Sequence, residues 1–138
     1  MYIGFILPNG KHHVSVAFCG HNESEHQYKR AVRALATAAD HWGAGPLELT
    51  FGTEVERFLP SKAWYAGVYS PDMLVFHDQL VKQLEYFEVD YSKEFDFTPH
   101  VTLSYFPKQP KNPYAGIVAE ARRISVVSNE FGNTDILI

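Results

Sequence analysis

Cysteine is almost absent from the sequence, and Cys19 is the one thiol in 138 residues. An internal disulfide is therefore excluded, because a disulfide needs two cysteines. Cys19 stands in an apolar run, where a lone cysteine is predicted to be a buried packing residue rather than a nucleophile.

Long apolar runs are absent as well. Residues 2–7, YIGFIL, are too few for the core of a signal peptide, and no basic segment precedes them. No other run approaches the ~20 apolar residues that a membrane helix needs. The protein is therefore expected to be cytoplasmic and to have no membrane partner.

Positive charge is in the minority. The 12 lysines and arginines are outnumbered by 16 aspartates and glutamates, which gives a formal net charge of -4. Long duplex nucleic acid is therefore not expected as a partner, because binding it requires many cations that neutralise phosphates. The composition, 46% hydrophobic and 20% charged, is that of a globular protein, and the length predicts a single domain, residues 1–138.

Hydrophobic periodicity predicts about seven strands and two helices in the order β-β-α-β-β-α-β-β-β. Two helices are too few for a doubly wound sheet, so the predicted class is α+β. The strands are expected at residues 1–7, 12–18, 46–59 with an interruption near Gly52, 63–69, 100–106, 121–127 and 134–138.

Both helices carry recognisable start signals. Ser24 with Gln27 fits a capping box, and Ser70 followed by Pro71 fits the start of the second helix. The expected apolar stripes are Tyr28, Val32, Leu35, Ala36 and Ala39 in the first helix, and Met73, His77, Leu80, Val81, Leu84 and Phe87 in the second. His77 is accordingly interpreted as a core or boundary residue.

Two stretches, KHHVSVAF and FTPHVTLSY, share the pattern histidine, valine, hydroxyl residue, apolar residue. Side chains two residues apart in a strand share a face. His13 and Ser15 therefore point to one side of their strand, and His100 and Thr102 to one side of theirs. An approximate two-fold relation between the halves of the chain would bring these polar faces together across a cleft.

Two imidazoles and two hydroxyls suit an in-line displacement at phosphorus. One imidazole removes a proton from the attacking oxygen, and the other protonates the leaving oxygen. Histidine titrates near neutral pH, so one ring can start neutral and the other charged. The hydroxyls can donate hydrogen bonds to the phosphoryl oxygens, where negative charge develops.

On these motifs the chain resembles the two-histidine (2H, LigT-like) phosphoesterase superfamily, whose signature is a pair of His-x-(Ser/Thr)-x motifs. FDFTPHVTLSYF is similar to the family's Phe-x-Pro-His-x-Thr-Leu, and WYAGVYSPDMLVFHDQL is similar to its central strand and second helix. The resemblance implies a bilobal fold of two pseudo-symmetric antiparallel-sheet lobes, each with an outer helix, and an active-site cleft between them. The catalytic residues carried over by position are His13, Ser15, His100 and Thr102.

The resemblance further implies a metal-independent phosphodiesterase that needs no cofactor. Its substrate would be a nucleotide or a short oligonucleotide, with a 2′,3′-cyclic phosphate, a 2′-5′ linkage and a cyclic-nucleotide signal all open; certain phage members of the superfamily destroy such defence signals. Seven histidines are present, but no His-Glu-x-x-His or paired-cysteine spacing is found, so no metal site is predicted.

Two departures concern substrate binding. The first hydroxyl is Ser15, where many members have threonine, and Tyr105 stands where the RNA-ligase-like branch often carries arginine. Tyr105 has the opposite strand parity to His100, so it reaches the cleft only if the strand twists or bulges. In residues 63–69, Trp64, Ala66 and Val68 are expected to pack in the core. Tyr65, Gly67 and Tyr69 are then left for the cleft, and Tyr65 and Tyr105 are the candidate substrate-binding residues.

Two further classes of function remain open beside the enzyme. The first is a module that sequesters a nucleotide or an RNA end without turning it over, and the second is a processing factor that acts only with a partner. Retention of two titrating groups favours cleavage, because binding alone needs neither. The protein is expected to be a monomer, and the sequence does not decide which histidine is the base.

Overall fold

The first two strands of the chain form a hairpin, as the turn signal Pro8-Asn9-Gly10 predicts. The structure, a computed structural model, describes residues 1–21 and 23–138. Strand β1 (Tyr2–Ile6) pairs antiparallel with β2 (His13–Phe18). Ile3 pairs with Ala17 and the next residue, Gly4, pairs with Ser15, so Val16 is the extra residue of a β-bulge in β2.

Helix α1 (Glu25–Trp42) starts and ends where its caps predict. The Ser24 hydroxyl accepts a hydrogen bond from the Gln27 amide, and Gly43 ends the helix with a left-handed backbone at φ 57°. The reciprocal half of the predicted capping box is not formed, because the Gln27 side chain donates to the Glu88 carbonyl instead.

The buried face of α1 differs from the predicted stripe. Its fully buried residues are Ala31, Ala34, Leu35 and Ala38. Four residues of the predicted stripe are only half-buried: Tyr28, Val32, Ala36 and Ala39. The buried stripe is therefore rotated toward the alanines.

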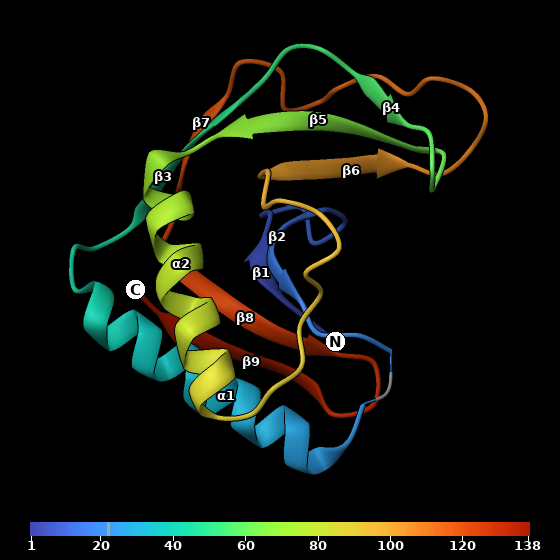
Figure 1. Cartoon of the computed structure of the whole chain (residues 1–138). Helices are drawn as coiled ribbons and strands as arrows, with labels where there is room; N and C mark the ends of the chain where they lie inside the picture. The colour runs from blue at the N-terminus through green and yellow to red at the C-terminus, as the bar shows by residue number, and fades with distance from the viewer. Residues whose placement is uncertain (22) are drawn as a thin grey trace.

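The remaining elements complete one curled antiparallel sheet (Figure 1). In the described residues it has nine strands in the order β7-β3-β5-β6-β2-β1-β8-β9, with β4 paired to β5 outside this path. The bounds not yet given are β3 (Leu47–Phe51), β4 (Glu56–Phe58), β5 (Ala63–Tyr69), β6 (His100–Ser104), β7 (Val118–Ala121), β8 (Arg123–Ser128) and β9 (Gly132–Leu137).

The interruption expected near Gly52 is confirmed, since residues 46–59 form two separate strands, β3 and β4, which both pair with β5. The expected strand list was incomplete in one place. Strand β7 was not predicted at all, because four residues with the exposed Val118 and Glu120 carry too little apolar alternation to indicate a strand.

The sheet divides into two lobes that meet at β6 and β2. One lobe contains β3, β4, β5, β6 and β7, and the other contains β1, β2, β8 and β9 (Figure 1). Helix α2 (Pro71–Tyr86) contacts β3 and β2, and α1 contacts β8 and β9. The predicted α+β class, with two antiparallel lobes and a helix on each, is confirmed.

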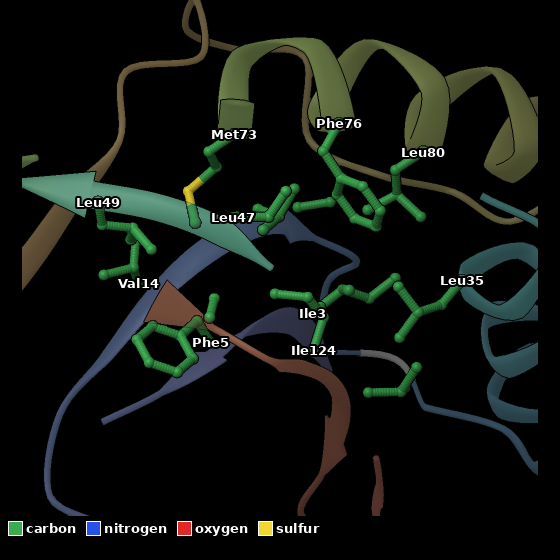
Figure 2. Close-up of a cluster of buried hydrophobic side chains, with 14 of the residues drawn as sticks. Ile3, Phe5, Val14, Leu35, Leu47, Leu49, Met73, Phe76, Leu80 and Ile124 are labelled. Carbon is green, nitrogen blue, oxygen red and sulfur yellow. The ribbon is translucent and has the colours of Figure 1, made fainter. Parts of the chain in front are cut away.

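The apolar core lies between the sheet and the two helices. Figure 2 shows Phe76 and Leu80 of α2 and Leu35 of α1 directed toward Ile3 of β1 and Leu47 of β3. The predicted stripe of α2 omitted Phe76, which is fully buried, whereas His77 is half-buried, in agreement with its interpretation as a boundary residue. His77 borders a cavity.

The expected faces of β5 were also partly wrong. Ala66 and Val68 are buried as predicted, but Trp64 is half-buried and its indole N–H donates to the Phe106 carbonyl at 3.0 Å. The register between β5 and β6 shifts between Trp64 and Tyr65, and this irregularity breaks the simple alternation of faces.

No helix within residues 1–21 and 23–138 is both long and apolar enough to span a membrane.

Candidate active site

The two histidine motifs meet where the lobes join. Val14 of β2 lies opposite Val101 of β6 in an antiparallel pair, and both valines are fully buried. One residue to either side of this pair, the register places His13 opposite Thr102 and Ser15 opposite His100. All four side chains lie on the face away from the buried valines, since neighbouring strand residues alternate.

This register gives the site an approximate two-fold arrangement about the Val14–Val101 pair, because each histidine faces the hydroxyl residue of the other motif. Directly opposed Cβ atoms in an antiparallel pair are about 5 Å apart, and diagonal ones about 7–8 Å. His13 and His100 form such a diagonal pair. Their two rings can therefore approach one phosphate from opposite sides.

His100 has a fixed ring orientation. Its Nδ1 lies 2.8 Å from the Thr98 carbonyl oxygen, which can only accept a hydrogen bond, so Nδ1 carries a proton. The Nε2 atom is the ring nitrogen that this hydrogen bond leaves free. The ring is exposed, and the Tyr65 ring meets it edge to face at 5.5 Å between centroids.

His13 lies in a different environment. Its ring stacks on Tyr2 at 4.0 Å between centroids with an interplanar angle of 16°. Burial lowers the pKa of His13 below its ordinary value, and the positive charges of His100 and His12 lower it further.

His12 serves the fold rather than the site. It lies on the opposite side of β2 from His13, and its Nδ1 is hydrogen-bonded to the hydroxyl of Tyr114. Tyr114 is buried and also accepts a hydrogen bond from the Asn9 amide. This contact ties the β1–β2 connection to the segment before β7.

A cavity of about 670 Å³ extends from the paired motifs. Ser15, His100 and Thr102 line one end of it, and Tyr65 and Tyr105 also border it. His13 is not among its lining residues; it lies beside this end on the same strand face as Ser15. The structure therefore brings all the residues predicted for the site to this cavity except His13, which lies at its edge.

Tyr105 reaches the cavity although its strand parity is wrong. Strand β6 ends at Ser104, whose hydroxyl accepts a hydrogen bond from the Phe106 amide at 3.0 Å. The chain turns there, and strand alternation no longer determines where Tyr105 points.

The other tyrosines of β5 behave differently. Tyr65 lies opposite Thr102, and hydrogen bonding to Glu56 together with burial raises its pKa, so its hydroxyl keeps its proton. Tyr69 is 73% exposed and does not border the cavity, and neither does Gly67. Gly67 lies opposite His100 and shares the face of Tyr65 as expected, but Ala63 and Tyr65 are the residues of β5 that border the cavity.

Sequence reasoning missed one wall of the cavity. Residues 91–98, here called segment 91–98, form part of the irregular connection between α2 and β6, and seven of its eight residues border the cavity. The Ser92 amide donates to the Phe18 carbonyl at 2.7 Å, and Phe95 meets Phe58 of β4 edge to face at 5.3 Å. The available signal was an aromatic-rich connection of unusual length, and such connections are commonly functional.

The side chains that could ligate a metal ion are scattered. Within the part of the chain that the structure describes, no three histidine, cysteine, aspartate or glutamate side chains are grouped so that they could hold an ion. Cys19 is half-buried, and burial raises the pKa of its thiol to about 12, which makes it a poor ligand or nucleophile near neutral pH.

Comparisons with known proteins agree with this geometry. The family model described as 2′-5′ RNA ligase superfamily matches residues 7–125. No curated protein matches the chain.

Solved structures share the fold at low identity. TT0787 of Thermus thermophilus is 13% identical with a TM-score of 0.66, over 99% of this chain and 93% of that one. E. coli LigT complexed with 3′-AMP is 15% identical with a TM-score of 0.60, over 98% and 78%. The MHV ns2 PDE domain is 16% identical with a TM-score of 0.57, over 92% and 76%.

Proposed function

Because the chain belongs to the 2′-5′ RNA ligase superfamily of two-histidine phosphoesterases, we propose that it is a metal-independent phosphodiesterase that acts on a nucleotide or a short oligonucleotide. The register about Val14 and Val101 carries the proposal, because it sets two imidazoles and two hydroxyls on one face at the end of a cavity. The cavity volume of about 670 Å³ suits one nucleotide rather than a long duplex.

The reaction is written for a 2′,3′-cyclic phosphate. Neutral His13 takes a proton from water as the water oxygen attacks phosphorus. The bond from phosphorus to one ribose oxygen breaks, and protonated His100 gives that oxygen a proton from Nε2. The hydroxyls of Ser15 and Thr102 donate to the non-bridging oxygens, where charge develops. The product is a phosphate monoester, and the net change is the addition of one water.

His13 is assigned as the base from its environment. A general base must be neutral at the working pH, and burial against Tyr2 favours the neutral imidazole by lowering the pKa of His13. His100 is assigned as the acid because the Thr98 carbonyl holds Nδ1–H and leaves Nε2 directed to the substrate.

Three substrate types are tested in one assay. Nucleoside 2′,3′-cyclic phosphates, 2′-5′-linked dinucleotides and 3′,5′-cyclic nucleotides are incubated with the protein, and the products are identified by mass spectrometry. The solved complexes of E. coli LigT with 3′-AMP, NADP+ and ATP support a nucleotide-sized ligand. Binding of a nucleotide without turnover of any member of the panel would make the sequestering module the better account.

Chelation provides an independent test. Since two imidazoles supply both proton transfers, phosphodiesterase activity is expected to be unchanged after dialysis against EDTA. The measurement is the initial rate with and without chelator. Loss of activity with rescue by Zn²⁺ or Mn²⁺ would contradict the assignment and require a metal-bound nucleophile.

Removing the ring that covers His13 should move the pH profile. Tyr2→Ala is expected to raise the pKa of His13 toward its ordinary value, since water then reaches the stacked face. The base is active in its neutral form, so the low-pH limb of kcat/KM moves to higher pH. The limbs belong to the coupled pair, and the NMR titration of the His13 ring is therefore measured as well.

The matched control is Tyr86→Ala, which removes an exposed ring of α2. It is expected to leave both the titration and the pH profile unchanged. An unchanged His13 titration in Tyr2→Ala would show that the stacked ring does not tune the base.

A further inference from the structure

His77 is a histidine that the proposed reaction does not use. It lies on α2, is half-buried and borders the cavity. Its Nδ1 is 2.8 Å from the Val16 carbonyl oxygen, and its ring stacks on Phe97 of segment 91–98 at 3.9 Å with an interplanar angle of 8°. One edge and one face of the ring are thus fixed by protein contacts.

The end of β6 explains why this contact exists. Strand β6 begins at His100, which lies opposite Ser15. Residues 16–18 of β2 therefore have no partner strand on the edge where β6 pairs with β2. The Val16 carbonyl bonds His77, and the Phe18 carbonyl accepts from the Ser92 amide. His77 and segment 91–98 therefore replace the missing strand and form the cavity wall next to Ser15.

The free atom of the ring is Nε2. The Val16 carbonyl can only accept, so Nδ1 carries a proton and Nε2 of the neutral ring is a hydrogen-bond acceptor. Among the described residues no partner bonds Nε2, and it is not one of the buried polar atoms left unpaired. Since the other edge faces β2, the Nε2 edge is the one that opens to the cavity.

We propose that His77 is a specificity-determining residue that accepts a hydrogen bond from the 6-amino group of adenine or the 4-amino group of cytosine, so that the preferred substrates are adenine and cytosine nucleotides. This inference rests on the proposed nucleotide substrate. Val16 directly follows Ser15, so a phosphate at Ser15 and a base at His77 can belong to one nucleotide. The aromatic rings of Tyr65 and Phe97 border the same cavity and give the base flat surfaces.

The expected discrimination follows from pairing donors with acceptors. Adenine and hypoxanthine have nearly the same shape, but position 6 carries an amino donor in adenine and an oxo acceptor in hypoxanthine. Position 4 of cytosine and uracil differs in the same way. An oxo group at Nε2 would set two acceptors against each other and leave both unpaired. Each pair is therefore expected to differ by about tenfold in Kd.

The test is equilibrium binding, which is independent of turnover. Kd values for 3′-AMP, 3′-IMP, 3′-CMP and 3′-UMP are measured by calorimetry at pH 8, where an imidazole is mainly neutral. Wild-type protein is expected to prefer 3′-AMP over 3′-IMP and 3′-CMP over 3′-UMP, each by about tenfold. Equal affinities within both pairs, or no binding of any of the four, would overturn the inference.

His77→Asn separates recognition from folding. Its amide can still donate to the Val16 carbonyl, but it has no acceptor at the position of Nε2, so both ratios are expected to fall to about one. If His77→Asn proves unfolded in a thermal melt, His77→Phe keeps a ring to stack on Phe97 and is expected to give the same ratios. Ratios that stay near ten in the folded variant would contradict the proposal.

His26→Gln, on the exposed surface of α1, is the matched control and should keep the wild-type ratios. The outcome is distinct from that of the proposed function. Base preference without turnover of any phosphodiester would retain the subsite and reject the enzyme, whereas turnover without base preference would do the reverse.

Discussion

Replacing His13 or His100 with alanine is expected to lower kcat by about 10²- to 10⁴-fold, the usual contribution of one positioned acid or base. His13→Ala removes the group that takes the proton from water, and His100→Ala removes the group that protonates the leaving oxygen. The double variant is expected to lose little more than either single one, because base and acid act as a unit. The measurement is steady-state kinetics on whichever phosphodiester the product assay identifies.

The hydroxyl residues provide a graded comparison. Ser15→Ala and Thr102→Ala each remove one hydrogen bond to a charged group and are expected to cost about 1 to 3 kcal/mol of transition-state stabilisation. All four variants should remain folded, because the changed side chains lie on the cavity face and not among the buried valines. Losses that simply multiply in the histidine double variant would contradict joint action.

A second large effect is expected from Gly4→Ala, which is predicted to destabilise the fold by about 3 kcal/mol, at the upper end of the usual cost of overpacking. Gly4 lies opposite the β-bulge of β2, and an added Cβ would be 2.6 Å from the Val14 carbonyl oxygen and 3.1 Å from the Ser15 Cα. Both contacts are with backbone, so β2 itself must move. The free energy of unfolding is measured by denaturant titration.

The same displacement should reach the site. Because Val14 and Ser15 belong to the first histidine motif, and Val14 pairs with Val101 of the second, Gly4→Ala is expected to lower kcat even where the protein is still folded. Gly67→Ala is the matched control, since an added Cβ at this strand position meets nothing within 4 Å. Its unfolding free energy should stay within about 0.5 kcal/mol of wild type. A Gly4→Ala protein as stable as the control would refute the close-approach argument.

Local sequence signals predicted the separate elements well. Caps at Ser24 and Ser70 set the starts of the two helices, and the glycine after Trp42 set the end of the first. The alternation around His13 and around His100 predicted which side chains share a face within each strand. These features depend on residues a few positions apart, so their physical causes are contained in short stretches of chain.

The pairing of the two motifs is a different matter. His13 and His100 are 87 residues apart (100 minus 13), and each motif predicts only its own face. The antiparallel register of Val14 with Val101 buries both valines in the core. The free energy of that burial depends on packing with residues from many parts of the chain. Catalytic roles for the four motif residues follow from the family resemblance and this register together, and they remain proposals for the kinetic tests.

The sequence by itself thus determined an α+β domain with two histidine–hydroxyl strands, since periodicity and capping are local. Tertiary structure alone decided that β8 and β9 return to pair beside β1, so that the lobes are not the two halves of the chain. It also decided that segment 91–98 and His77 wall the cavity. Segment 91–98 has no periodicity of its own, and its path is set by the unpaired edge of β2 and by contacts with Phe58 and His77. Such contacts join distant parts of the chain and exist only once the sheet has formed.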